Sequence, residues 1–219
     1  MINDIVLIDK PADMTSFGVV ARLRRILSEQ TGYKVKVGHT GTLDPFATGL
    51  MILLTGKKCH EADHYTKLDK WYEAKIRLGE TSSTGDPEGE IKQISSIQPS
   101  KGEILQALEQ FRGEIQQIPP IFSAIKVNGQ RAYKLARSGK DVEMPVRNVN
   151  IYSLEMISYE YPYLKIRTHV SSGTYIRTLA QDVGEKLGVG AYCQELRRTK
   201  IADFDVKDAK TLADLGIFS

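Results

Sequence analysis

Residues 38–49 run Gly-His-Thr-Gly-Thr-Leu-Asp-Pro-Phe-Ala-Thr-Gly, a stretch of unusual composition for a connecting loop. Three glycines and three threonines surround a single carboxylate, Asp44. Glycine lets a backbone approach a ligand closely, and threonine hydroxyls form local hydrogen bonds that can fix a loop. Pro45 biases Asp44 towards an extended conformation. The pattern indicates either a braced loop that presents a reactive acid or an ordinary Asp-Pro turn.

The segments around this loop predict a mixture of strands and helices. Strands are expected at 4–9, 34–37, 50–54, 72–78, 122–127, 147–160, 163–171 and 195–204. Helices are expected from the Thr15-Ser16 cap to Gly32, near 57–67, near 104–111, near 131–138, at 174–187, and at the end of the chain. The helix near 104–111 would have Ile104, Leu105, Leu108 and Phe111 on one face. Turns are expected at 79–89 and at Asn128-Gly129. Because these elements alternate irregularly, we expect an α+β fold with a mixed, largely antiparallel central sheet flanked by helices, in one domain over residues 1–219.

The composition excludes several classes of protein. The chain has 219 residues, of which 41% are hydrophobic and 26% charged, so a disordered chain is excluded. Its two cysteines, Cys59 and Cys193, form no CxxC pair, which excludes a disulfide scaffold and a zinc ribbon. The longest aliphatic run, Leu50 to Leu54, is five residues, too short for a membrane span. With no signal peptide predicted at the amino terminus, we expect a cytoplasmic protein.

The net charge of +3 conceals basic clusters. Residues 119–147 contain six Lys or Arg against two acids, a local charge of +4. Arg22, Arg24 and Arg25 lie on the first predicted helix, and Arg197, Arg198 and Lys200 lie near the end of the chain. Such local clusters suit contacts to phosphates, and a solvated surface is an equally good interpretation.

One short motif suggests a metal. His60-Glu61-Ala62-Asp63-His64 is an HExxH sequence, which on a helix places two imidazoles one turn apart to bind zinc. The extended pattern would place Gly at 67 and His at 70, where this chain has Lys67 and Lys70. The segment also lacks an apolar face. We therefore interpret it as a polar surface helix, and no metal is predicted.

Arg177 provides a second indication of a site. It lies in the first turn of the helix that follows Gly173-Thr174, where the helix macrodipole disfavours a cation. An anionic partner is therefore expected. If that partner is Asp44, the carboxylate stays ionised and oriented, as a nucleophile or a base requires.

Together these segments resemble the bacterial TruB family, the tRNA pseudouridine-55 synthases. The resemblance rests on GHTGTLDPFATG at 38–49, IDKP at 8–11, TS at 15–16, KWY at 70–72, IPPIFSAIKVNG at 118–129, SSGTYIRTLAQDVGEKLG at 171–188 and LRR at 196–198. It covers nearly the whole chain in order. It implies a pseudouridine synthase fold and the isomerisation of uridine 55 in the tRNA T-loop, without metal or organic cofactor.

The resemblance also assigns residues. Asp44 would be the catalytic aspartate, attacking ribose C1′ or removing a proton at C2′, and Arg177 would pair with it. Tyr72 would stack on the flipped uracil and help remove the C5 proton. For substrate binding, His39 would hold the target out of its stack, Tyr175 and Leu196 would line the uracil pocket, and Lys10 would support the pocket or a phosphate.

The resemblance implies partners and two departures from the family. The partner would be the T-arm and T-loop of tRNA, bound by a monomer, with residues 119–147 as a thumb-like insertion that orders on RNA. Most relatives carry a carboxyl-terminal PUA domain, which is not expected here. Ser82 stands where relatives usually have Asp, whereas Asp86 is retained. Two alternative functions remain, a non-catalytic tRNA-folding chaperone and, on the HExxH sequence, a zinc hydrolase.

Overall fold

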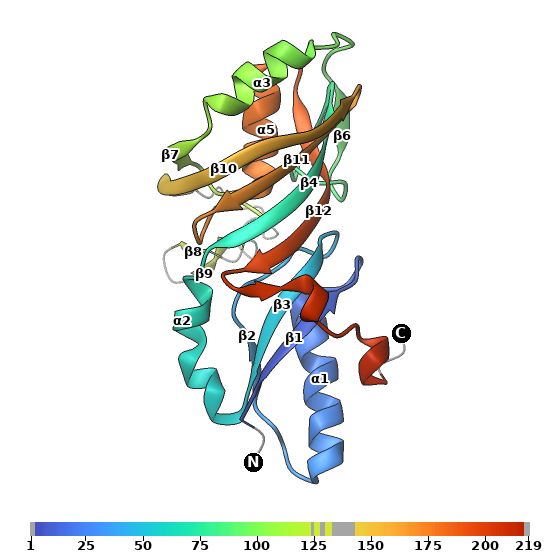
Figure 1. Cartoon of the computed structure of the whole chain (residues 1–219), viewed down its shortest axis with the longest axis vertical. Helices are drawn as coiled ribbons and strands as arrows, with labels where there is room; N and C mark the ends of the chain where they lie inside the picture. Colours follow the sequence, from blue (N-terminus) through green and yellow to red (C-terminus); the bar gives the residue numbers. More distant parts are fainter. Residues whose placement is uncertain (1–2, 124, 128–129, 133–142, 217–219) are drawn as a thin grey trace. The chain divides into compact units, whose positions relative to one another are not determined.

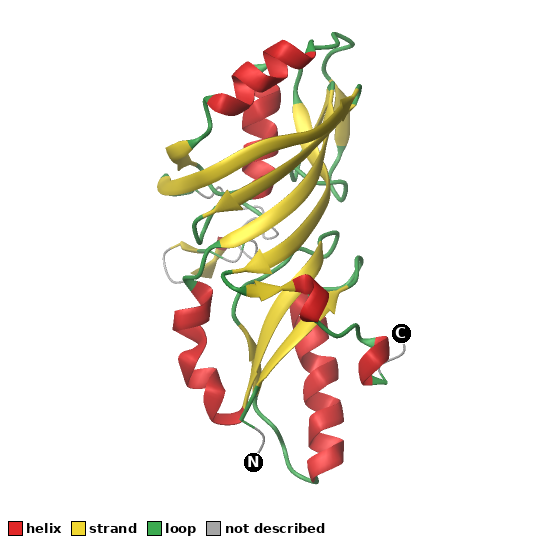
Figure 2. Cartoon of the chain, in the orientation of Figure 1, coloured by secondary structure: helices red, strands yellow, loops and turns green. Residues whose placement is uncertain are grey.

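The computed structural model describes residues 3–123, 125–127, 130–132 and 143–216. The contacts between backbone segments divide the chain into two compact units (Figure 1). The first consists of Met1–Tyr72 with Arg197–Ser219, and the second of Glu73–Leu196. Both units combine strands with helices, as the colouring of Figure 2 shows. No helix within the described residues is long and apolar enough to cross a membrane.

The first unit is organised around β3 (Thr48–Thr55), in which seven of eight residues are buried. Strand β1 (Ile5–Lys10) pairs with it antiparallel, from Ile5 opposite Leu54 to Lys10 opposite Gly49. Strand β2 (Val37–His39) is also antiparallel to β3, whereas the end of β12 (Ala191–Ile201) runs parallel to its start. The apolar run predicted as a strand therefore sits in the middle of this part of the sheet.

Helix α1 (Ser16–Thr31) confirms the predicted capping signals. The Thr15 hydroxyl accepts a hydrogen bond from the Gly18 N–H, and Gly32 ends the helix in the left-handed conformation that glycine adopts at low cost. The apolar positions Val19, Val20 and Leu23 are buried. The polar helix predicted near 57–67 is instead divided into a 3-10 turn, η1 (Gly56–Glu61), and a short helix, α2 (Ala62–Thr66).

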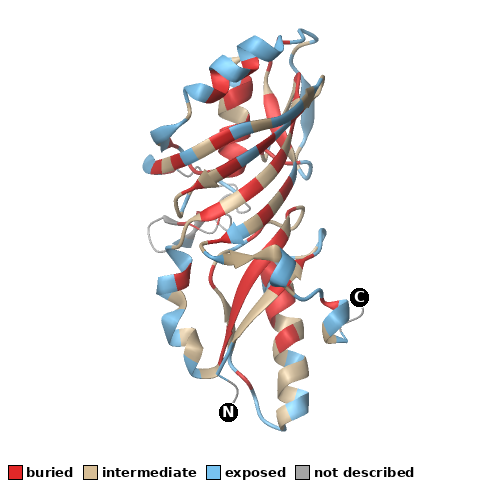
Figure 3. Cartoon of the chain, in the orientation of Figure 1, coloured by how far each residue is buried: buried red, intermediate tan, exposed pale blue. Residues whose placement is uncertain are grey.

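The second unit contains the larger part of the sheet, in the order β12-β4-β11-β10-β7. The bounds are β4 (Lys70–Leu78), β11 (Tyr163–Val170), β10 (Arg147–Glu160) and β7 (Gly113–Gln117). Strand β10 is antiparallel to both β11 and β7. Burial alternates along β4, and Figure 3 shows the same alternation in several strands. The predicted α+β fold with a mixed, largely antiparallel sheet is confirmed.

Two helices contribute to the core of the second unit. Helix α3 (Lys101–Glu109) begins with a capping box between Ser100 and Glu103 and contacts both β10 and α5. Helix α5 (Ile176–Lys186) is more deeply buried and carries Arg177. The remaining short elements are β5 (Glu80–Ser82), β6 (Ile91–Gln93), β8 (Lys126–Val127), β9 (Gln130–Arg131), β13 (Phe204–Asp205), η2 (Val206–Asp208) and η3 (Ala213–Leu215).

Several predictions differ from the structure. The strand predicted at 34–37 begins only at Val37, and the turn-rich stretch 79–89 contains β5, which pairs with β6 as a hairpin. Leu105 was placed on the apolar face of its helix but is 48% exposed, because Ile104, Ala107 and Leu108 form the buried face. Most of the basic helix predicted near 131–138, the turn at 128–129 and much of the predicted thumb lie outside the described residues.

Candidate active site

Two buried side chains of the first unit hold the backbone on either side of Asp44. The Ser16 hydroxyl donates to the Leu43 carbonyl and accepts from the Leu43 N–H, both at 2.8 Å. The Lys10 ammonium donates to the Pro45 carbonyl at 2.9 Å, and also to the carbonyls of Pro11 and Met14. Asp44 is half-buried between these two contacts. The interpretation as a braced loop, rather than a simple turn, fits this geometry.

A third buried side chain, Arg198 on β12, completes the bracing. Its guanidinium donates to the Gly41 carbonyl at 3.1 Å and to the Leu50 carbonyl at 2.7 Å, so it joins both ends of the loop. Gly49 makes this approach possible, because a Cβ there would lie 2.3 Å from the Arg198 carbonyl oxygen. Gly49 also has φ +105°, a conformation that favours glycine. The predicted basic cluster therefore contributes a structural arginine here, not a surface charge.

Its neighbour Arg197 is held in a different way. The guanidinium forms two hydrogen bonds to the Asp9 carboxylate, at 3.0 and 2.7 Å, and lies 3.4 Å from the Thr48 hydroxyl. The contact links β12 to β1 at the edge of the loop. Arg197 is therefore also engaged within the protein, although its side chain is 40% exposed.

His39, Lys10 and Tyr72 lie in the same unit as Asp44. His39 ends β2, opposite Leu53 of β3, and is half-buried. Tyr72 is on the buried face of β4 and is 7% exposed. Lys10 is fully buried and contacts the loop through the Pro45 carbonyl. Its support of the uracil pocket or of a phosphate stays a prediction. The contacts of His39 and Tyr72 with an RNA base stay predictions.

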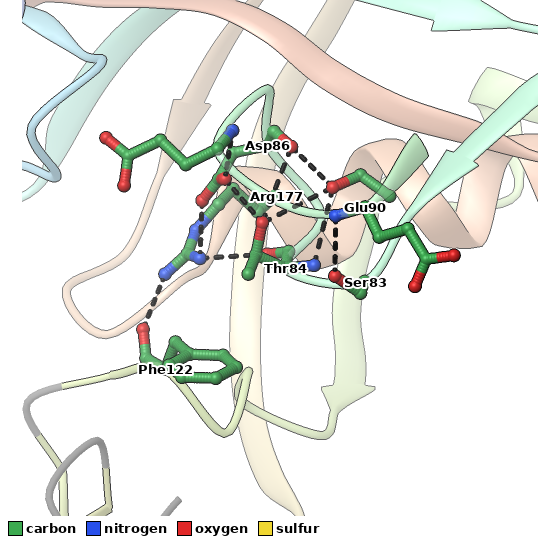
Figure 4. Close-up of polar contacts among 8 residues, drawn as sticks. Ser83, Thr84, Asp86, Glu90, Phe122 and Arg177 are labelled. Atoms are coloured by element: carbon green, nitrogen blue, oxygen red, sulfur yellow. Dashed lines mark hydrogen bonds and ion pairs between the residues drawn. The ribbon is translucent and has the colours of Figure 1, made fainter. Parts of the chain in front are cut away.

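Arg177, in the second unit, has the anionic partner that its helix position predicted. Its guanidinium donates to an Asp86 carboxylate oxygen at 2.8 Å, and both side chains are at most 5% exposed (Figure 4). It also donates to the carbonyls of Thr84 at 2.9 Å and Phe122 at 2.8 Å. Arg177 thus joins the β5–β6 connection to the start of the predicted thumb. Its pairing with Asp44 stays a prediction.

The connection between β5 and β6 is built to present Asp86. One carboxylate oxygen of Asp86 accepts from the Thr84 hydroxyl and from the Glu88 N–H, which leaves the other oxygen directed at Arg177. The Ser82 hydroxyl donates to the Asp86 carbonyl. Ser82, where relatives were expected to have Asp, therefore makes a loop contact of its own. Asp86 was missed as a site residue, although its Asp-Pro sequence in a glycine-rich turn was visible.

Tyr175 and Leu196 lie in the second unit with Arg177. Tyr175 immediately precedes α5, and its backbone N–H and carbonyl both bond the buried amide of Gln117. Its half-buried side chain packs against the cluster of Ile125, Ala132 and Met144. Leu196 is 8% exposed on β12. Their role in lining a uracil pocket stays a prediction.

The HExxH segment does not have the geometry of a zinc helix. His60 is in the 3-10 turn η1 and His64 in α2, and both are exposed. Glu61 forms an ion pair with Lys58 at 2.9 Å. Within the described part of the chain, no group of three or more His, Cys, Asp or Glu residues could hold a metal ion. The segment is the polar surface element that was favoured on sequence.

Lys70, next to Arg198, is a buried cation whose pKa is lowered in the folded protein. Its ammonium donates to the carbonyls of Thr66 and Leu68, and it is 7% exposed. Burial and, to a lesser extent, the charge of Arg198 lower its pKa to about 8, against a smaller opposing effect of Asp69. The charged form is therefore disfavoured in the folded state. Burying the charged ammonium therefore lowers the free energy of unfolding below pH 8. This destabilisation disappears as the pH rises towards the ordinary lysine pKa near 10.4.

We expect Lys70→Met to stabilise the protein at pH 7 by about 2 kcal/mol, because the gain from removing the buried charge exceeds the loss of hydrogen bonds to two carbonyls. The advantage should vanish near pH 10, where the wild-type lysine is neutral in the folded state. Urea unfolding of both proteins at pH 7 and 10 measures the difference. An equal difference at the two pH values would show that Lys70 does not titrate as described.

Comparison with known proteins identifies the family to which these features belong. The family model described as "TruB family pseudouridylate synthase (N terminal domain)" matches residues 24–176, and the "tRNA pseudouridylate synthase B C-terminal domain" model matches residues 177–217. The chain belongs to the TruB family. It is therefore a pseudouridine synthase, an isomerase, and the resemblance seen in the sequence is confirmed.

Relatives in the TruB family cover almost all of the chain. It is 42% identical over 215 residues to tRNA pseudouridine synthase B of Azoarcus sp., covering 98% of this chain and 70% of the relative. It is 45% identical over 217 residues to the enzyme of the same name from Chloroherpeton thalassium, covering 97% and 89%. This TruB chain is similar to these two enzymes. The tRNA in their names is the substrate of those proteins.

Solved structures share the fold. One chain of a Cbf5-Nop10-Gar1 complex matches with a TM-score of 0.75 and 30% sequence identity. The match covers 96% of this chain and 53% of that chain. An H/ACA RNP bound to a substrate RNA containing 2′-deoxyuridine gives a TM-score of 0.71 at 27% identity, with 51% of that chain covered. The TruB chain thus spans about half the length of these solved chains.

Proposed function

We propose that this TruB chain converts uridine 55 in the T-loop of tRNA to pseudouridine, with Asp44 as the catalytic aspartate. The observation that carries the proposal is the bracing of residues 38–49 by Lys10, Ser16 and Arg198. Burying two cations and a hydroxyl against backbone carbonyls costs solvation free energy. This unfavourable solvation term is explained if the loop must hold one carboxylate in a fixed position.

The reaction balances without an oxidant or reductant. The bond between ribose C1′ and uracil N1 breaks, the uracil turns, and a new bond joins C5 to C1′. The proton lost from C5 is matched by the proton gained at N1. Asp44 either attacks C1′ and is later displaced, or removes the C2′ proton to form a glycal and later returns a proton. Both routes require an ionised carboxylate.

The other residues have separate tasks in the proposed reaction. Arg177 orients the Asp44 carboxylate and is itself held by Asp86. Tyr72 stacks on the extruded uracil, and Tyr175 and Leu196 limit its movement while it turns. His39 occupies the space that the target base leaves. The substrate nucleotide has to leave its stack, which is easier in a loop than in a duplex.

The substrate assignment is tested with a hairpin that contains only the T-arm. We expect the protein to release tritium from a [5-³H]uridine-labelled T-arm hairpin at a rate within about tenfold of that from whole tRNA, since reaction-specific contacts surround the target nucleotide. A hairpin with cytidine at the position of uridine 55 is the control. Release from whole tRNA but none from the hairpin would contradict the T-arm as the recognised element.

A further inference from the structure

An exposed aromatic ring lies at the amino-terminal end of α1, where Ser16 contacts the Asp44 loop. Phe17, the second residue of α1, is 64% exposed. Tyr33, which follows the other end of the helix, is also exposed, at 42%. The two residues lie at opposite ends of α1, whose 16 residues span about 24 Å along the helix axis. Single exposed apolar residues are common, so Phe17 needs a second observation to indicate a site.

The second observation is a cation over the ring. The Arg24 guanidinium carbon lies 5.9 Å from the centre of the Phe17 ring, two helical turns further along α1. Arg22 and Arg25 add positive charge to the same helix, and Glu29, 4.0 Å from Arg25, is its acidic residue. Aromatic rings combined with arginines are the components with which proteins bind unpaired bases. An RNA loop offers both an unpaired base for the ring and phosphates for the arginines.

The backbone next to Phe17 is anchored to the backbone next to Asp44. Ser16, immediately before Phe17, is the residue that holds both backbone groups of Leu43, immediately before Asp44. Phe17 therefore follows a residue that contacts the Asp44 loop, and Asp44 follows the residue that this contact holds. All of these residues belong to the first unit.

We propose that Phe17 and Arg24 form a stacking site for one unpaired nucleobase of the RNA, next to the extruded uridine. The inference rests on the proposed function. Extrusion of a uridine leaves a neighbouring base of the loop without its stacking partner, and an exposed ring beside the active site replaces that partner. Arg24 then contacts the phosphate of the same nucleotide.

The test uses variants at Phe17 in the Asp44→Asn background, in which RNA binding is measured without turnover. We expect Phe17→Ala to weaken tRNA binding about tenfold and Phe17→Trp to restore it. Phe17→Leu, which is apolar but cannot stack, should behave like the alanine variant. Tyr33→Ala is the matched control, with unchanged affinity. The fluorescence of Phe17→Trp, measured against Trp71 as the only native tryptophan, should be quenched by tRNA.

Arg24→Gln tests the phosphate contact separately. We expect weaker binding and a reduction of about one in the slope of log affinity against log salt. Unchanged affinity in Phe17→Ala, or equal affinities of the Leu and Trp variants, would overturn the stacking site. If wild-type protein releases no tritium while the Phe17 variants still bind RNA as described, the stacking site stands and the proposed reaction fails.

Discussion

Asp44→Asn is expected to reduce pseudouridine formation by about 10³-fold or more, with tRNA binding unchanged. Loss of a general base removes roughly 10²–10⁴ in rate, and loss of a nucleophile removes more. The amide has the shape of the carboxylate, and the loop is held through the backbone of Gly41, Leu43 and Pro45, so the fold should be retained. Tritium release and filter binding with the same tRNA measure the two effects.

The matched control for this variant is Asp203→Asn, an exposed acid in the turn between β12 and β13. It should have wild-type activity. Asp44→Asn with full activity would remove Asp44 from the mechanism. A protein that binds tRNA but shows no activity even as wild type would instead be the non-catalytic RNA chaperone considered as an alternative.

Asp86→Asn is expected to lower both stability and activity. The substitution removes a negative charge from the Arg177 guanidinium at a site where both side chains are at most 5% exposed. Removing one partner of a buried ion pair costs about 3 kcal/mol. Activity should fall by about 10²-fold, because Arg177 is proposed to orient Asp44 and reactions are sensitive to small displacements of catalytic groups. Urea unfolding and single-turnover tritium release measure the two effects.

Two further variants separate the effects on stability and activity. The double variant Asp86→Asn/Arg177→Met should recover part of the lost stability, since no buried guanidinium remains, but none of the activity. Glu73→Gln disrupts the exposed ion pair with Arg167 and should change stability by less than about 1 kcal/mol. A loss of stability in Asp86→Asn no larger than in Glu73→Gln would contradict the structural role of Asp86.

The sequence predicted best what depends on local patterns. Helix α1 follows directly from the Thr15 cap, the spacing of its apolar residues and Gly32. Strand β3 follows from an unbroken apolar run, and β4 from alternation. The edge strand β7 was missed because only its end, Gln117, is buried, so it has neither pattern.

Contacts between residues far apart in the chain could not be predicted in this way. Asp86 and Arg177 are 91 residues apart, and the helix position of Arg177 required an acid without specifying which one. Ser16 was predicted only as part of a helix cap, whereas its hydroxyl hydrogen-bonds to the backbone of Leu43. Arg198 was expected to contact solvent or a phosphate and Lys10 to support the pocket or a phosphate, and neither expectation included full burial. Their burial depends on carbonyls that only the folded chain brings together.

The most direct test of the central claim is tritium release by the wild-type protein from a [5-³H]uridine-labelled tRNA transcript. The proposed function predicts one equivalent of tritium per tRNA, and none from a transcript with cytidine at position 55. Equal release from the two transcripts, or no release from a folded protein that binds tRNA, would contradict it.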